Sequence, residues 1–276
     1  MIKPMLAYKV GKKDIDFTES VFMQPKLDGI RCLISKDGAF TRTGKEIKNI
    51  QHITRKLKPF FDTHKDHILD GELYNHKLKD DFEKIVSCVR KTKLNTKSIA
   101  ESQRLVQFHL YDYIHPSNKN YGARMFALEN FNFYGKYIKH VPTTLVKDRD
   151  HSQVVHQVNL KAGYEGSILR LDKPYENKRS YNLQKFKDFH DDEATITGYE
   201  EGKGKRQGTL GKFLMTDDEG IEFGCPPGKG YSYKDLSDML LNIHDYMGQR
   251  ATFTYFERTK ANSYRHPLFK CLRNYE

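Results

Sequence analysis

The chain has 276 residues, of which 37% are apolar and 30% charged, and its formal net charge is +11 at pH 7. No stretch approaches the run of about 20 apolar residues that a membrane-spanning helix needs, and the N-terminus lacks the apolar core of a secretory signal. Four widely spaced cysteines lack the spacing of a zinc ribbon and favour free thiols. The sequence therefore predicts an intracellular protein of a reducing compartment, without a membrane partner.

The charge is unevenly distributed along the chain. Residues 1–188 carry 35 basic and 22 acidic side chains, whereas residues 189–276 carry 12 and 14. This change predicts two domains, 1–188 and 189–276. A basic surplus suits a polyanionic partner, although it can also simply keep a protein soluble.

Strands and helices alternate irregularly in the first domain. Apolar residues flank Asp37-Gly38, which predicts a β-hairpin of residues 30–36 and 39–43. Apolar residues recur with helical spacing from Phe82, which predicts a helix over 81–91. Further helices are expected over 123–138 and 153–160, and further strands over 68–74, 105–114, 167–171 and 183–189.

After Asp191 the pattern changes to short strands joined by glycine-rich turns. Strands are expected over 194–199, 210–216, 221–224 and 251–256, with one helix over 234–247. Short strands with a single helix in under 90 residues fit a small barrel of the OB type. The predicted fold class is an α+β domain followed by an OB-fold β-barrel.

The segment Lys26-Leu27-Asp28-Gly29-Ile30-Arg31 is the main candidate for chemistry. A lysine is a nucleophile only when deprotonated, which burial or nearby cations favour. We expect Gly29 to let the backbone approach a ligand, and Arg31 to grip phosphate or ribose. The alternative is an exposed turn, because Asp-Gly is common in turns.

This segment matches K-x-D-G-x-R, and it resembles the first motif of the superfamily that contains ATP-dependent DNA ligases and mRNA capping enzymes. The chain most resembles small viral and bacterial DNA ligases made of a nucleotidyltransferase (adenylation) domain and an OB domain. The resemblance implies that Lys26 attacks the α-phosphorus of ATP and carries AMP as a phosphoramidate. The implied activity is sealing of 3′-hydroxyl/5′-phosphate nicks in duplex DNA through lysyl-AMP and DNA-adenylate intermediates.

Further segments resemble the family's other motifs, in the family's order. In 69–73 the resemblance implies that Glu72 contacts ribose and assists metal binding. In 108–112 it implies that Tyr111 stacks on adenine, and in 165–170 that Ile168 packs on the other face while Glu165 binds Mg²⁺ (or Mn²⁺). In 183–187 it implies that Lys185 and Lys187 contact the α-phosphate; alternating positions on a strand place both on one face.

Other residues complete the implied nucleotide site. Gln24, two residues before the nucleophile, would read the adenine amino group, because its amide carbonyl can accept a hydrogen bond. Leu27, Arg31 and Arg179 are also assigned to ATP. Cations around Lys26 would stabilise the charge that builds on the α-phosphate and favour the neutral amine.

The segment 41–44 resembles the family's next motif, which implies that Arg42 contacts the 5′-phosphate strand at the nick. Further candidates for DNA contact are Thr43 and Lys45 in the first domain, and Lys203, Lys205 and Arg206 in the second. The latter lie in a stretch, 202–211, that resembles the OB domain of DNA ligases, although a solvated charge run is the alternative. Arg265 and Arg273 resemble the R-x-P…R ending of small ligases, which implies that they meet pyrophosphate when the OB domain closes; the Arg-x-Asp-Lys ending of larger ligases is not matched.

We expect a monomer that binds nicked duplex DNA. The rival functions are an RNA-directed nucleotidyltransferase and a non-enzymatic nucleic-acid-binding protein.

Overall fold

The computed structural model describes every residue except 1–2, 12, 132, 134, 188–189, 229, 256, 260–261 and 274–276. The chain divides into two compact units, Met1–Lys187 and Asp188–Glu276, one residue before the predicted boundary. The expected strand ends at Phe189 and Phe256 lie outside the described residues. None of the helices in the described part of the chain is both long and apolar enough to cross a membrane.

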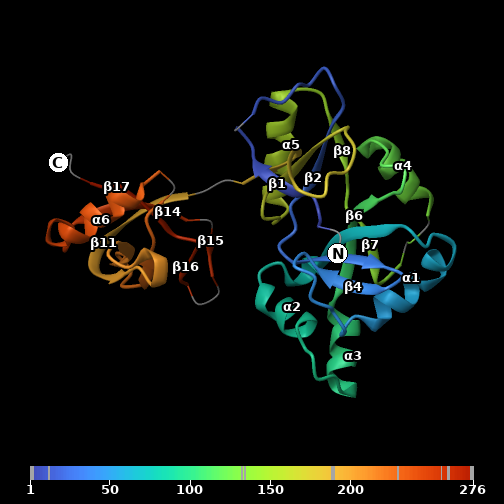
Figure 1. Cartoon of the computed structure of the whole chain (residues 1–276), viewed down its shortest axis with the longest axis horizontal. Coiled ribbons are helices and arrows are strands. Elements are labelled where there is room, and N and C mark those ends of the chain that lie inside the picture. Colours follow the sequence, from blue (N-terminus) through green and yellow to red (C-terminus); the bar gives the residue numbers. More distant parts are fainter. Residues whose placement is uncertain are drawn as a thin grey trace. The chain divides into compact units, whose positions relative to one another are not determined.

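The first unit contains two five-stranded sheets (Figure 1). The first sheet has the order β1 (Leu6–Lys9), β10 (Arg179–Phe186), β9 (Ser167–Leu171), β2 (Val21–Pro25) and β8 (Thr144–Val146). Its β1 and β10 are parallel, and its other pairs are antiparallel. Helix α5 (Arg149–Lys161) packs against β2 and β8.

The second sheet has the order β4 (Gly38–Thr41), β3 (Ile30–Ser35), β5 (Ile68–Tyr74), β6 (Gln107–Ile114) and β7 (Ile138–His140). Its helices are α1 (Gln51–Thr63), α2 (Phe82–Val89), α3 (Thr96–Leu105) and α4 (Tyr121–Asn130), with a 3₁₀ turn at His76–Leu78. The main core lies between these helices and the sheet, where Leu57, Leu73 and Phe108 are fully buried.

The predicted β-hairpin is confirmed, since β3 and β4 pair antiparallel across Asp37. The helix expected over 123–138 is wrong in its second half. Helix α4 ends at Asn130, because Phe131 and Phe133 pack against Phe60 of α1, and Ile138 begins β7.

Helices α1 and α3 were not predicted. Pro59 lies inside α1, and an internal proline ordinarily argues against a helix. The buried positions of α3 are Ser98 and Ser102, so this helix has no apolar periodicity. Because α3 runs to Leu105, strand β6 begins two residues later than expected, at Gln107.

The second unit is a five-stranded sheet in the order β13 (Glu222–Cys225), β12 (Leu210–Thr216), β11 (His190–Glu201), β14 (Arg250–Tyr255) and β17 (Leu268–Leu272). A parallel bridge from Pro227 to Phe269 brings the two end strands together and closes a small barrel. The barrel is filled by aromatic side chains such as Phe213 and Phe253.

The remaining elements of this unit are a short hairpin of β15 (Glu257–Arg258) and β16 (Tyr264–Arg265), 3₁₀ turns at Gly204–Arg206 and Ile243–Asp245, and helix α6 (Tyr233–Leu241). The helix expected over 234–247 is therefore shorter than predicted. Its regular hydrogen bonding stops at Asn242, and the 3₁₀ turn continues it to Asp245.

Candidate active site

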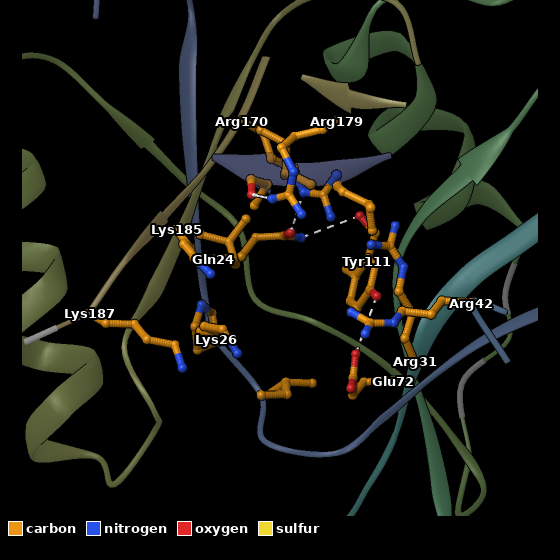
Figure 2. Close-up of a pocket in the computed structure, with 16 residues that line it drawn as sticks. Gln24, Lys26, Arg31, Arg42, Glu72, Tyr111, Arg170, Arg179, Lys185 and Lys187 are labelled. Atoms are coloured by element: carbon orange, nitrogen blue, oxygen red, sulfur yellow. Dashed lines mark hydrogen bonds between the residues drawn. The ribbon is translucent and has the colours of Figure 1, made fainter. Parts of the chain in front are cut away.

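A cavity of about 300 Å³ lies in the first unit and is lined by strands of both sheets (Figure 2). This volume is at the lower end of the range for small-molecule sites. The sequence-predicted residues that line it are Gln24, Lys26, Leu27, Arg31, Arg42, Glu72, Tyr111, Ile168, Arg179, Lys185 and Lys187. Five lining residues were not predicted: Leu6, Ala7, Pro25, Arg170 and Leu183.

Lys26 lies directly after β2, in a loop bonded to the loop that precedes β9. The Lys26 N–H donates to the Gly166 carbonyl (2.8 Å), and the Glu165 N–H donates to the Lys26 carbonyl (3.2 Å). Gly166 has a φ of +146°, and a Cβ there would lie 2.3 Å from the Phe186 carbonyl oxygen. Glycine is thus required where β9 and β10 approach, and this approach brings Glu165 to Lys26 and Lys187.

Glu165 bridges two of the predicted lysines. One carboxylate oxygen pairs with Lys26 Nζ and the other with Lys187 Nζ, and the carboxylate is only 6% exposed. The sequence interpretation considered only cations around the nucleophile. The structure adds the Glu165 carboxylate, which pairs with the Lys26 side chain.

Gly29 has a packing role that the sequence analysis did not consider. A Cβ at this position would lie 2.4 Å from the Leu73 carbonyl oxygen on β5. The glycine therefore permits close packing of this segment against β5, and the expected approach of its backbone to a ligand stays a prediction.

Arg31 lines the cavity, but most of its guanidinium is held by protein. Its Nε and one terminal nitrogen donate to the two Asp70 oxygens (2.9 and 2.6 Å), and its other terminal nitrogen donates to the Met5 carbonyl (2.6 Å). Burial alone would lower the pKa of Arg31, but the Asp70 carboxylate offsets this and raises the pKa above its ordinary value. Arg31 can therefore bind phosphate or ribose, as expected, only through those N–H groups that do not already donate to Asp70 and Met5.

Glu72 and Tyr111 lie on neighbouring strands, β5 and β6. The Tyr111 hydroxyl donates to a Glu72 carboxylate oxygen at 3.3 Å. Burial raises the pKa of Glu72 to about 7, against the opposing charges of Lys26 and Arg31. The guanidinium carbons of Arg31 and Arg170 lie 5.7 Å and 5.1 Å from the centre of the Tyr111 ring. Ile168 of β9 lines the same cavity.

The donor set fits a divalent cation in part. Among the described residues, no group of three or more His, Cys, Asp or Glu side chains is placed to hold an ion. Glu72 and Glu165 offer the oxygen ligands that Mg²⁺ prefers, and Mg²⁺ commonly takes one or two carboxylates together with substrate phosphates. Both Glu165 oxygens contact lysines, so they would bind a metal only after this pairing changes.

The residues predicted to contact DNA lie in both units. In the first unit, exposed Arg42 lines the cavity, while Thr43 and Lys45 are exposed in the turn that follows β4. The Lys45 N–H donates to the Thr41 hydroxyl at 3.0 Å, which closes this turn. Arg179, which was assigned to ATP rather than to DNA, lies on β10 and donates to the Ala7 carbonyl at 2.5 Å.

In the second unit, Lys203, Lys205 and Arg206 are exposed, but the backbone of their loop is fixed. The Tyr233 hydroxyl donates to the Lys205 carbonyl at 3.1 Å, and the buried Thr209 hydroxyl donates to the Arg206 carbonyl at 2.6 Å. Of the two residues predicted to meet pyrophosphate, Arg265 lies on β16 and Arg273 pairs with Glu193.

Buried charged groups behind the cavity were missed by sequence analysis. Asp112 is fully buried on β6 and accepts hydrogen bonds from Arg124 (2.7 and 3.1 Å) and from Arg170 (2.8 Å). The sequence held one hint of Asp112 and Arg170, because both lie in segments that resemble family motifs: Asp112 follows Tyr111, and Arg170 ends the segment that begins at Glu165.

Comparison with known proteins gives a consistent result. Residues 4–187 match the family described as ATP dependent DNA ligase domain, and residues 201–273 match the DNA ligase OB-like domain. The chain is 26% identical to a DNA ligase of Haemophilus influenzae over 79% of this chain and 75% of that one. It is 30% identical to a DNA ligase of African swine fever virus over 76% of this chain, but spans only 52% of that protein.

Among solved structures, the chain resembles one described as a Lig E DNA ligase that binds DNA with a minimal scaffold. The TM-score is 0.82 at 25% identity, and the match covers 99% of this chain and 100% of that one. The ATP-dependent DNA ligase of bacteriophage T7, solved with ATP, has the same fold at 17% identity and a TM-score of 0.58.

Proposed function

Because the chain belongs to the ATP-dependent DNA ligase family, we propose that it seals nicks in duplex DNA with Lys26 as the nucleophile. The observation that carries this proposal is the cavity itself. It holds Lys26 beside Lys185 and Lys187, with a tyrosine and an isoleucine available for a base. The rival reading of a decayed, non-enzymatic protein leaves this gathering of cations unexplained.

The proposed reaction has three transfers. Lys26 Nζ, after losing a proton, attacks the α-phosphorus of ATP; an N–P bond forms and the bond to pyrophosphate breaks. A 5′-phosphate oxygen of the nick then attacks the same phosphorus and displaces Lys26. Finally the 3′-hydroxyl attacks the 5′-phosphate, loses its proton and displaces AMP.

The residues of the cavity would divide the work by charge and shape. Lys185, Lys187 and Arg179 supply cations for the charge that builds on the α-phosphate, where preorganised charges act most strongly. Tyr111 and Ile168 hold the adenine between them. Glu72 and Glu165 would hold Mg²⁺ (or Mn²⁺), which when bound neutralises charge on the leaving pyrophosphate.

Binding of nicked DNA is proposed to be electrostatic and independent of sequence. The position of Arg42 at the cavity supports a contact to the 5′-phosphate of the nick. The exposed side chains of Lys203, Lys205 and Arg206 on a fixed loop support phosphate contacts by the second unit. We further propose that Arg265 and Arg273 meet pyrophosphate in the first transfer.

We also propose that the protein works as a monomer in a reducing compartment. The four cysteines are free thiols, three of them buried, which supports the second part of this proposal.

The decisive experiment follows the label from α-³²P-ATP. The wild-type chain should retain label as a protein adduct and seal a singly nicked duplex. Lys26→Ala should lose both activities but still seal a nick that already carries AMP, because the last transfer does not use the lysine. The exposed Lys58→Ala is the matched control. Adduct formation by folded Lys26→Ala would disprove the assignment.

A further inference from the structure

Gln24 is almost completely buried, 2% exposed, where it lines the cavity from β2. Its side-chain carbonyl accepts from Arg170 Nε at 2.7 Å, and its amide nitrogen donates to the Thr143 hydroxyl at 2.9 Å and, more weakly, to the Tyr111 carbonyl at 3.5 Å. Figure 2 shows the contacts to Arg170 and Tyr111 as dashed lines.

The partners of Gln24 determine which way its amide points. A guanidinium can only donate, so the atom facing Arg170 must be the carbonyl oxygen. A backbone carbonyl can only accept, so the atom facing Tyr111 must be the nitrogen. The Thr143 hydroxyl donates to the Val141 carbonyl at 3.2 Å, which leaves its oxygen to accept from Gln24. All three contacts favour the same orientation of the amide, and the contact to Arg170 is the shortest of them.

Arg170 is itself held firmly. It is 3% exposed, it also donates to the buried Asp112 carboxylate (2.8 Å), and Asp112 is fixed by Arg124. The Arg170 guanidinium carbon lies 5.1 Å from the ring centres of both Tyr111 and Tyr121. Its donor to Gln24 is therefore preorganised before any nucleotide enters.

These contacts leave Gln24 with one unused hydrogen-bonding capacity. Both hydrogens of its amide nitrogen are engaged, and one lone pair of its carbonyl is taken by Arg170, so only the second lone pair remains. Toward a base, Gln24 can thus act only as an acceptor. Adenine presents an amino donor at position 6, whereas guanine presents a carbonyl acceptor.

We propose that Arg170 is the positioning residue for purine selection: it locks the Gln24 amide so that the cavity accepts a 6-amino purine and rejects a 6-oxo purine. This inference rests on the proposed function and on the role that the resemblance implies for Gln24, whose amide carbonyl would accept from the adenine amino group. Arg170 itself acts through Gln24 and does not take part in phosphate chemistry.

The test measures formation of the covalent nucleotide adduct with four triphosphates: ATP, 2,6-diaminopurine triphosphate, ITP and GTP. The wild-type chain should use the first two and reject the last two, because only position 6 matters. Use of ITP at the rate of ATP would overturn the proposal, since rejection of GTP would then come from its 2-amino group. No adduct with any triphosphate would instead refute the proposed function.

The variant Arg170→Met keeps an unbranched side chain but removes the guanidinium that holds the Gln24 carbonyl, so the orientation of the amide then depends only on its contacts to Thr143 and Tyr111. We expect the ratio of the ATP rate to the ITP rate to fall at least about tenfold, the change that loss of one directional hydrogen bond supports. Arg179→Met is the control: an arginine of the same cavity without a contact to Gln24, it should slow both nucleotides and leave the ratio unchanged.

A double-mutant cycle separates positioning from general damage. In a Gln24→Met background there is no amide to orient, so Arg170→Met should cause no further change in the ratio. An equal additional fall there would overturn the proposal. If Arg170→Met does not fold, Arg170→Lys keeps the charge beside Asp112 but loses the forked geometry, and the same fall in the ratio is expected. An unchanged ratio in a folded variant would refute the role.

Discussion

Replacing Gly166 by alanine should disable the first transfer without unfolding the protein. The new Cβ would lie 2.3 Å from the Phe186 carbonyl oxygen, against the 3.0 Å below which real Cβ atoms essentially never come, so the two segments must separate by about 0.7 Å. The same Cβ would lie 3.4 Å from the Lys187 Cα. The alanine would therefore push the loops that hold Lys26 and Glu165 away from the end of β10, which Lys187 follows.

Two magnitudes follow. A misplacement of about 1 Å can cost about 100-fold in rate, so lysyl-AMP formation should fall by up to that factor. Alanine at a φ of +146° also costs about 1–3 kcal/mol of backbone strain, which should lower the melting temperature by about 2–4 °C per kcal/mol for a unit of this size.

The assay is single-turnover formation of the labelled adduct, at roughly 10 °C below the melting temperature of the less stable protein, so that the variant stays folded. Gly135→Ala is the matched control, because a Cβ there meets nothing within 4 Å. Wild-type adduct formation by Gly166→Ala would refute the reasoning. So would a rate loss that disappears on cooling, because the defect would then be unfolding alone.

Three further outcomes are expected. Tyr111→Ala should weaken ATP binding about 10- to 100-fold, since stacking contributes about 1–3 kcal/mol per base, while Tyr111→Phe should bind nearly normally; equal binding by all three proteins contradicts the stacking role. Burial raises the pKa of Glu72 from 4.5 to about 7, so the folded protein keeps this proton at a pH where the unfolded chain has lost it. The free energy of unfolding should therefore fall by up to about 3 kcal/mol from pH 5 to pH 8. Urea unfolding of Glu72→Gln should show a smaller fall. Neutralising Lys203, Lys205 and Arg206 together should raise the KM for nicked DNA. It should also reduce the steepness with which the logarithm of the DNA-binding constant falls with the logarithm of the salt concentration, by up to about 0.9 per lost phosphate contact. An unchanged slope would mean that these side chains face only solvent.

The sequence predicted elements best where apolar alternation and turn residues coincide. Strands β5, β9 and β12 have the predicted bounds, because each combines buried apolar residues with clear ends. Helix α3 has no such signal, since it buries Ser98 and Ser102. The end of α4 depends on contacts of Phe131 and Phe133 with Phe60, about 70 residues earlier, which no local pattern encodes.

For the site, resemblance predicted the residues but not their partners. The structure gathers the predicted lysines, Glu72 and Tyr111 around one cavity. The pairing of Glu165 with Lys26 depends on β9 lying beside β2, and that of Asp70 with Arg31 on β5 lying beside β3, so single motifs could not reveal either. The same holds for Arg170, whose importance comes from a contact across β2 and β9.

The two sheets of the first unit draw on the chain in different ways, with a consequence for synthesis. The second sheet uses only residues 30–140, whereas the first sheet joins strands from residues 6–25 to strands from residues 144–186. During translation the second sheet can form while the first still lacks most of its partners, because contacts distant in sequence form last. A nascent chain stopped near residue 145 should therefore protect the amides of β3, β5 and β6 from exchange, yet bind no ATP.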